Sequence, residues 1–249
     1  MSELQHPDAR PFESVAGLYE RFRPEYPPDA VAWIVEKLDL REGRRVLDLG
    51  AGTGKLTRAL VETGAHVIAV EPGEAMLAEL IRGVPEAEAV HGAAEAIPFE
   101  NGSVDGITVG QAFHWFRHDE ALPEMHRILQ PGGGVALIWN ARDPDVPVTQ
   151  ELKDLLAEFV PSQRAAPGRW SDKLRESALF GALEDQQFRF AEALDADTFA
   201  GRIMSISFVA AAPAKKQAEL EGKLRELVAA HGGTIELPYL TDVYVSYAV

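Results

Sequence analysis

The chain has 249 residues, of which 46% are hydrophobic, enough for one sizeable core and too few for two large domains. Its formal net charge is -15, from 24 Lys and Arg against 39 Asp and Glu, which disfavours a nucleic-acid partner because phosphate binding needs a basic face. There is no cysteine, which excludes structural disulfides and cysteine-ligated zinc.

Residues 1–43 combine helical stretches with a segment that is rich in proline. The prolines between residues 24 and 28 interrupt any long helix. Asp29 is then expected to cap a helix with an amphipathic spacing of Val31, Ile34, Val35 and Leu38.

From Arg44 onward, short apolar runs alternate with amphipathic helices. The expected strands are 45–49, 66–70, 87–91, 105–110 and 135–139. The expected helices are 55–62, 74–81 and 121–129. Strands and helices that alternate at such short intervals predict βαβ units and a parallel sheet.

The last part of the chain has a different pattern. Residues 141–186 are polar and helical with several proline breaks, which indicates an inserted or lid-like region. Polar and apolar residues alternate over 187–190 and again over 243–249, on either side of an expected helix at 215–230. Two closing strands around one helix predict an antiparallel edge on the parallel sheet.

The strongest functional signal is the segment VLDLGAGTGK, residues 46–55. Gly50, Gly52 and Gly54 lie between a buried strand and a helix, where glycine lets the backbone turn tightly and approach a ligand. The G-x-G-x-G spacing differs from the dinucleotide motif G-x-G-x-x-G, and Leu49 stands where a P-loop needs glycine. Taken alone, the cluster is equally consistent with a tight strand-to-helix turn.

The second signal is Glu71, which directly follows the expected second strand. A carboxylate there can accept two hydrogen bonds from a ribose diol, at close to the ~20-residue offset of nucleoside-binding α/β folds. The alternative is a solvated acid that the helix dipole favours. Beside the glycine turn, the ribose role is the better interpretation.

These segments and their order resemble the class I S-adenosylmethionine-dependent methyltransferases. Residues 46–57 resemble the first family motif, 67–72 the second, 92–105 the loop and strand that follow, and 124–133 the helix and turn before strand five. The chain is also similar to the small-molecule branch (ubiquinone/menaquinone-biosynthesis and trans-aconitate methyltransferases, methyltransferase type 11). That similarity rests on GQAFHWF, residues 110–116, and on the segment 19–27.

The resemblance implies a doubly wound, Rossmann-like α/β fold. Its mostly parallel, seven-stranded sheet would end in an antiparallel strand, with helical lid elements beside it. It implies one domain over 1–249, with an N-terminal helical lid at 1–43, a cofactor-binding core at 44–140, a helical insertion at 141–186, and C-terminal strands and a helix at 187–249.

The resemblance further implies S-adenosyl-L-methionine as cofactor and assigns residues to it. The glycine turn would line its methionine part, Asp48 would hold its ammonium group through water, and Glu71 would bind the ribose hydroxyls. Gln111 would lie where the methionine end meets the acceptor. The complete cofactor set is Tyr19, Arg23, Asp48, Gly50, Ala51, Gly52, Gly54, Glu71, Pro72, Met76, Ala94, Glu95 and Gln111.

Within this set, Pro72 and Met76 would flank the adenine, and Ala94 and Glu95 would lie at its edge. Many relatives carry an aspartate just before that Ala-Glu pair, which accepts from the adenine amino group. Ala93 stands at that position here and lacks this acceptor. Tyr19 and Arg23 would fold over the site, although a surface ion pair is an equal alternative for Arg23.

His114 is the candidate catalytic residue, since a histidine with a near-neutral pKa can act as general base. The alternative is a packed aromatic cluster at a helix start, with His114 only hydrogen-bonded. A carboxylate acceptor would need no base, whereas a phenol or carbon acid would use one. The histidines show no metal-ligand spacing, so no metal is expected.

The functional hypothesis is methyl transfer from S-adenosylmethionine to an oxygen or carbon of a small organic molecule. The alternatives are an NAD-dependent oxidoreductase and a non-catalytic S-adenosylmethionine-binding module. The chain start has no basic segment before an apolar run, and no stretch approaches the roughly 18 apolar residues of a spanning helix. We expect a cytoplasmic monomer or homodimer with no membrane or nucleic-acid partner.

Overall fold

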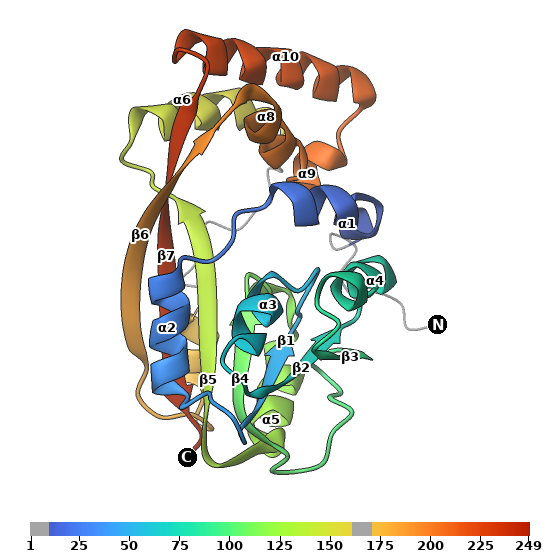
Figure 1. Ribbon diagram of the computed structural model, residues 1–249, viewed down its shortest axis with the longest axis vertical. Helices are drawn as coiled ribbons and strands as arrows, with labels where there is room; N and C mark the ends of the chain where they lie inside the picture. The colour runs from blue at the N-terminus through green and yellow to red at the C-terminus, as the bar shows by residue number, and fades with distance from the viewer. Residues whose placement is uncertain (1–9, 161–170) are drawn as a thin grey trace. The chain divides into compact units, whose positions relative to one another are not determined.

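The computed structural model describes residues 10–160 and 171–249, which divide into two compact units (Figure 1). The sheet unit comprises Glu25–Asn140, 171–188 and Thr241–Val249. The helical unit comprises 10–24, 141–160 and 189–240. Three long strands contribute residues to both units: β5 (Leu129–Arg142), β6 (Glu184–Leu194) and β7 (Ile235–Tyr247).

The seven strands form one sheet in the order β3-β2-β1-β4-β5-β7-β6. The first five strands are parallel. β1 (Arg45–Leu49) pairs with β2 (His66–Glu71) and β4 (Val104–Gly110), β2 pairs with β3 (Glu88–His91), and β4 pairs with β5. β7 runs antiparallel to β5, as two backbone hydrogen bonds show. The N–H of Ala248 donates to the Gly133 carbonyl, and the N–H of Asp143 donates to the Pro238 carbonyl. The expected Rossmann-like sheet with an antiparallel last strand is confirmed.

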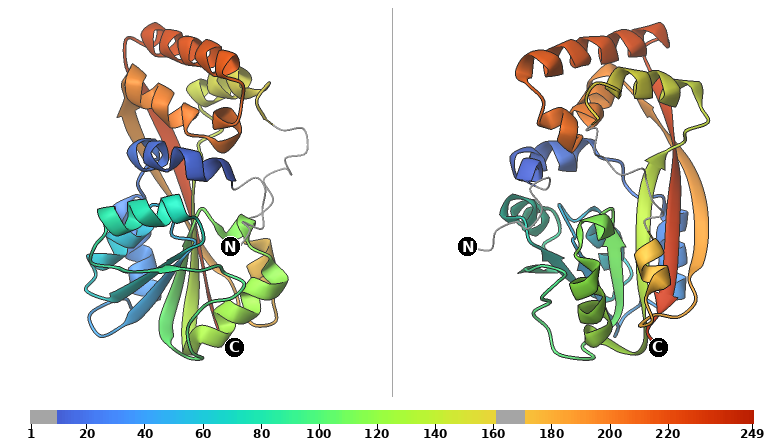
Figure 2. Two further views of the ribbon diagram at one scale, coloured as in Figure 1. Left: turned by 90° about the vertical axis from the view of Figure 1, so that its right-hand side faces the viewer. Right: turned by 180° about the vertical axis from the view of Figure 1, so that it is seen from behind.

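Helices cover both faces of the sheet in the sheet unit. One face packs α2 (Pro28–Lys37) and α3 (Lys55–Val61), and the other packs α5 (His118–Ile128), as the side views show (Figure 2). Successive strand residues point to opposite faces. Val46 accordingly packs with α2 and α3, whereas Leu47 packs with α5. The smaller elements are α4 (Glu74–Gly83), the 3-10 helix η2 (Phe113–Trp115) and α7 (Asp172–Glu176).

The start of α2 differs from the expectation. Pro27 is the N-cap and Pro28 the first helical residue, so Asp29 lies inside the first turn and does not cap the helix. Proline suits the first position because the backbone N–H that it lacks would have no helical partner there. The carboxylate of Asp29 still interacts favourably with the positive end of the helix dipole.

The helical unit has its own hydrophobic core, formed by α6 (Pro147–Leu156), α8 (Ala196–Met204), α9 (Ser207–Ala210) and α10 (Ala214–Ala230) with β6 and β7. Helix α1 (Arg10–Phe22) packs on α8 and α9. Arg202 is buried, and its Nε donates to the Phe22 carbonyl over 2.6 Å. A Cβ at Gly201 would lie 2.5 Å from the Phe22 ring, so only glycine lets α1 approach α8 this closely.

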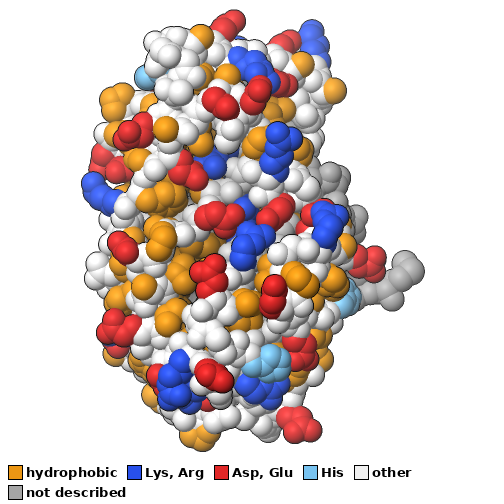
Figure 3. Space-filling model, in the orientation of Figure 1, with side chains coloured by type: hydrophobic (Ala, Val, Ile, Leu, Met, Phe, Trp, Pro, Cys, Tyr) orange, Lys and Arg blue, Asp and Glu red, His pale blue; other side chains and the backbone are white. Residues whose placement is uncertain are grey.

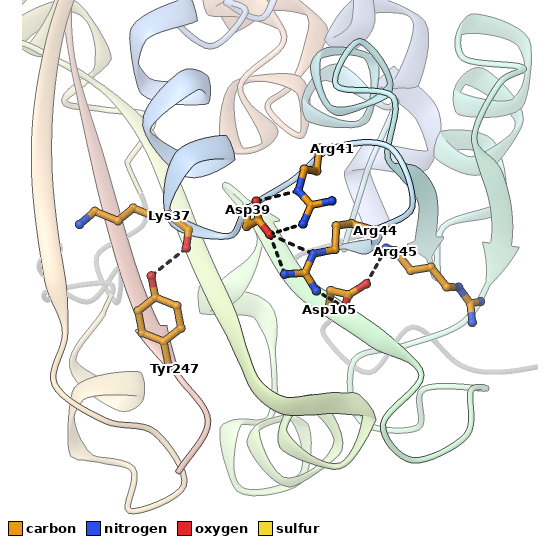
Figure 4. Close-up of polar contacts among 7 residues, drawn as sticks. All are labelled: Lys37, Asp39, Arg41, Arg44, Arg45, Asp105 and Tyr247. Atoms are coloured by element: carbon orange, nitrogen blue, oxygen red, sulfur yellow. Dashed lines mark hydrogen bonds and ion pairs between the residues drawn. The ribbon is translucent and has the colours of Figure 1, made fainter.

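A cluster of charges joins the amino ends of β1 and β4 (Figure 4). The Asp105 carboxylate accepts from the Arg45 backbone N–H and from the Arg44 guanidinium, each over 2.8 Å. Arg44 also bonds Asp39, and the pKa of Asp39 is lowered by its hydrogen bonds from Arg41 and Arg44. This cluster aligns the two strands at the edge of the sheet opposite to their carboxyl ends.

The surface of the described residues carries charges of both signs. On the face that Figure 3 draws, acidic and basic side chains are interspersed. Within the described part of the chain, no helix has both the length and the apolar character needed to cross a membrane.

Candidate functional site

The glycine turn between β1 and α3 folds back onto the end of β2. The amides of Gly50 and Ala51 both donate to the Val70 carbonyl, over 2.8 and 3.1 Å. Gly50, Gly52 and Gly54 have φ values of 69°, 59° and 88°, a left-handed conformation that favours glycine. The turn is therefore fixed by the neighbouring strand at the carboxyl edge of the sheet.

Two of these glycines meet different surroundings. A Cβ at Gly50 would lie 2.7 Å from the Cβ of Ala112, so the turn packs tightly there. Apart from Gly52 and its two chain neighbours, no heavy atom of the described residues lies within 4 Å of the place that a Cβ at Gly52 would occupy. Gly52 thus borders open space in which a ligand can approach the backbone.

Glu71 links the glycine turn to the loop after β2. Its Oε2 accepts from the Gly52 amide over 2.9 Å, and its Oε1 accepts from the Gly73 amide over 2.8 Å. The side chain is 8% exposed. A carboxylate has about four lone-pair sites, so it can accept from several donors at once.

Asp48 is buried within the sheet rather than at its surface, with 1% exposure. Its Oδ2 accepts from the Thr57 hydroxyl over 2.6 Å and its Oδ1 from Thr108 over 3.0 Å. Burial raises the pKa of Asp48 to about 6, although both threonine hydrogen bonds lower it. Asp48 therefore holds the start of α3 against β1 and β4, and its role toward a cofactor ammonium stays a prediction.

The predicted adenine residues come from three neighbouring segments. Met76 is a buried residue of α4, and Pro72 precedes that helix, with its carbonyl 2.9 Å from Nε2 of His91. Ala94 is buried beside the end of β2, and Oε1 of Glu95 accepts from the Arg117 amide over 2.8 Å. The amide of Gly92 donates to the Glu71 carbonyl, which brings this loop beside the glycine turn.

Gln111 follows β4 at the same carboxyl edge. Its φ of 57° is left-handed, which is uncommon for a residue other than glycine. Its backbone N–H donates to the Ile138 carbonyl over 2.9 Å, and its side-chain Nε2 donates to the Asn140 carbonyl over 3.0 Å. These two bonds to β5 hold a backbone conformation of the kind that often marks functional sites.

His114 lies in η2 with its ring centroid 4.7 Å from that of Trp115. The nearby His118 bonds the Phe113 carbonyl, and burial lowers the pKa of His118 from its usual value. The structure shows the His114 ring packed beside the Trp115 ring, and the catalytic role of His114 stays a prediction.

Tyr19 and Arg23 belong to the helical unit. The Arg23 guanidinium lies 5.2 Å from the Tyr19 ring centroid, and its NH2 group donates to the Ser205 carbonyl over 3.4 Å. These contacts lie within that unit. The predicted role of both residues toward the cofactor stays a prediction.

Three residues of the carboxyl edge were not predicted: Glu25, Lys55 and Asn140. Lys55 opens α3 directly after Gly54, and its ammonium lies 2.7 Å from Oε1 of Glu25. Asn140 on β5 donates to the Glu25 carbonyl over 3.0 Å. The sequence held one signal of these contacts. Lys55 is a cation at the start of an expected helix, where the dipole favours anions, so a carboxylate partner could have been expected.

Comparisons with known proteins agree with this geometry. A family model described as a methyltransferase domain matches residues 47–137. An uncharacterized methyltransferase of Mycobacterium tuberculosis is 36% identical over 239 residues, covering 92% of each chain. A demethylmenaquinone methyltransferase of Clavibacter sepedonicus is 35% identical over 122 residues, covering 47% of this chain and 49% of that one.

A solved structure is similar over nearly the whole chain. It is a proposed type II methyltransferase from Anaeromyxobacter dehalogenans, with 27% identity and a TM-score of 0.68. The match covers 90% of this chain and 97% of that one. The chain therefore belongs to the class I S-adenosylmethionine-dependent methyltransferases.

Proposed function

We propose that the protein binds S-adenosylmethionine at the carboxyl edge of its sheet and transfers the methyl group to an oxygen or carbon of a small organic molecule. The observation that carries the proposal is the Glu71 carboxylate, bonded to Gly52 and Gly73 beside open space at Gly52. The family assignment favours this function over an NAD-dependent oxidoreductase.

The residues present fit the cofactor. Glu71 would accept hydrogen bonds from the ribose hydroxyls, and the glycine turn would bring backbone close to the methionine part. Pro72 and Met76 would flank the adenine, with Ala94 and Glu95 at its edge. Asp48 acts from within the core by holding α3 and the turn in place.

When bound, S-adenosylmethionine supplies a methyl group that its positive sulfur already activates. The protein then has to orient the acceptor in line with that group and exclude water. Gln111, held at the end of β4, is proposed to lie where acceptor and methionine end meet. No proton has to move if the acceptor is a carboxylate.

The proposed acceptor is a small molecule rather than a nucleic acid. The formal charge of -15 and the mixture of charges in Figure 3 do not favour phosphate binding. The similar Clavibacter protein is named for a quinone-type substrate, which supports a small aromatic acceptor.

Titration calorimetry tests the cofactor. We expect S-adenosylmethionine and S-adenosylhomocysteine to bind with micromolar affinity and NADH to give no heat of binding. Binding of NADH in their place would contradict the proposal. Binding of the adenosyl ligands without turnover of any acceptor would favour a non-catalytic module.

His114 is proposed as the general base for acceptors that must lose a proton. With phenols, His114→Gln is expected to lower turnover by about 10²-fold or more, since a positioned base typically contributes that much. With dicarboxylates it should leave turnover unchanged. The measurement is release of S-adenosylhomocysteine against pH for both acceptor classes.

The control for His114→Gln is His66→Gln, at the half-exposed amino end of β2. Equal phenol turnover in the two variants would assign His114 to packing alone.

A further inference from the structure

Asn140 connects two segments that are far apart in the sequence. Its Nδ2 donates to the Glu25 carbonyl over 3.0 Å, and its Oδ1 accepts from the Thr241 hydroxyl over 2.7 Å. A carbonyl oxygen can only accept, so the Glu25 contact sets which way the amide faces. Thr241 is fully buried on β7, so its hydroxyl is held in place. The Asn140 side chain therefore has one defined orientation.

The Glu25 side chain connects this contact to the glycine turn through Lys55. Its Oε1 lies 2.7 Å from Nζ of Lys55 and 3.5 Å from the Arg58 guanidinium. The Lys55 side chain is 9% exposed and begins α3 immediately after Gly54. A buried cation at a helix N-terminus is unfavourable both by burial and by the helix dipole. The Glu25 carboxylate offsets both effects and keeps the start of α3 in place.

Two further contacts centre on the same place. The Asn140 carbonyl accepts from Nε2 of Gln111, the residue with the left-handed backbone after β4. A Cβ at Gly110 would lie 2.5 Å from the Tyr26 hydroxyl, so Tyr26 packs directly against the end of β4. Residues 25 and 26 thus lie across the carboxyl ends of β4 and β5, between Lys55 and Asn140.

We propose that Asn140 is a positioning residue for the cofactor: it fixes Glu25, and Glu25 through Lys55 fixes the glycine turn in its binding conformation. This inference rests on the proposed function, because it concerns the same cofactor. The Asn140 side chain donates to Glu25, whereas Gln111 bonds the Asn140 backbone carbonyl, which a side-chain substitution leaves in place. The effect of a side-chain substitution on affinity is therefore expected to pass through Glu25. That dependence gives a test which a purely structural role would not satisfy.

The test is a double-mutant cycle on the full chain, read by calorimetric titration with S-adenosylhomocysteine. Asn140→Asp keeps the acceptor for Thr241 but loses the donor to Glu25. Glu25→Gln removes the charge that pairs with Lys55. Each single variant is expected to weaken binding about tenfold, because each leaves one hydrogen-bonding or ion-pairing group without its partner. The double variant should bind only slightly more weakly than either single one, because both changes break the same connection.

Two matched controls make the same chemical changes elsewhere. Asn101→Asp alters an exposed turn, and Glu184→Gln breaks the 2.6 Å ion pair with Lys37. Both are expected to bind S-adenosylhomocysteine as the unmodified protein does. The Glu25 side chain is 57% exposed, so Glu25→Gln should fold normally even if Asn140→Asp does not. Thermal unfolding of every variant separates lost affinity from lost fold.

The outcomes are distinct. Normal affinity in Glu25→Gln would overturn the inference, as would a double variant weakened about hundredfold, the product of two independent tenfold losses. If Asn140→Asp only lowered the unfolding temperature and bound normally, Asn140 would be structural and the inference wrong. If the unmodified protein failed to bind S-adenosylhomocysteine, the proposed function itself would fall and this inference with it.

Discussion

Glu71→Ala is expected to weaken binding of S-adenosylhomocysteine by about 10²–10³-fold, measured by titration calorimetry. The carboxylate accepts from the amides of Gly52 and Gly73, and the whole side chain is 8% exposed. Alanine would leave both donors unsatisfied and would remove the proposed acceptor of the ribose hydroxyls. Hydrogen bonds to a charged group contribute about 1.5–3 kcal/mol each, so losing the ribose contacts alone accounts for this range.

A second substitution at the same position separates charge from shape. Glu71→Gln has nearly the same size, but its amide presents one acceptor oxygen and one donor nitrogen. The nitrogen would face a backbone N–H of Gly52 or Gly73, so we expect a loss closer to that of alanine than to the unmodified protein. Glu74→Ala, an exposed acid in the first turn of α4, is the control. Unchanged affinity in Glu71→Ala would show that the ribose assignment is wrong.

Asp48→Asn is expected to stabilise the protein at neutral pH. Burial raises the pKa of Asp48 to about 6, well above the 3.8 of an exposed aspartate. The carboxyl therefore makes its full favourable contribution to the free energy of unfolding below about pH 4, and this contribution is lost as the pH rises through about 6. Above that range the native state holds a buried carboxylate, which costs about 3 kcal/mol relative to the unfolded chain. Asparagine cannot ionise, and its amide can pair with both Thr57 and Thr108.

The measurement is urea unfolding of both proteins between pH 4 and pH 8. The difference in unfolding free energy should grow with pH and level off above about pH 7. Asp185→Asn, an exposed residue of β6, serves as the control. A difference that does not change with pH would contradict the prediction. If the more stable Asp48→Asn variant binds the cofactor more weakly, the buried acid lowers stability but is needed for cofactor binding.

Much of the fold between residues 45 and 139 was predictable, because its signals are local. Glycines end strand β1 at the predicted residue, and strands covered on both faces are nearly continuous apolar runs. Three strands were predicted too short, among them β6, which spans Glu184–Leu194 where the alternation predicted 187–190. β5 begins at Leu129, which pairs with Val104 of β4, and the pairing resumes at Gly134 after a shift in register. A Cβ at Gly133, within the shift, would lie 2.9 Å from the Asp105 carbonyl. β7 begins at Ile235, upstream of the predicted start.

Other features needed the folded chain. Helix α8 was not predicted, although Asp195 caps it by accepting from the Thr198 amide, a signal that the sequence contained. The contacts of Glu25 with Lys55 and Asn140 span 30 and 115 residues, so no local pattern could indicate them. The glycine turn and Glu71 were recognisable because family motifs are short and contiguous, whereas the residues that support them come from distant segments.

The place of β7 in the sheet has a consequence for how the protein is made. This strand comes last in the chain, yet it lies between β5 and β6. While the ribosome is still adding residues, β5 and β6 therefore lack the strand that pairs with both of them. Synthesis at about 5–20 residues per second leaves this part of the sheet incomplete for seconds. Until β7 is made, the edges of β5 and β6 that it will cover present unpaired backbone groups, which can pair with other chains.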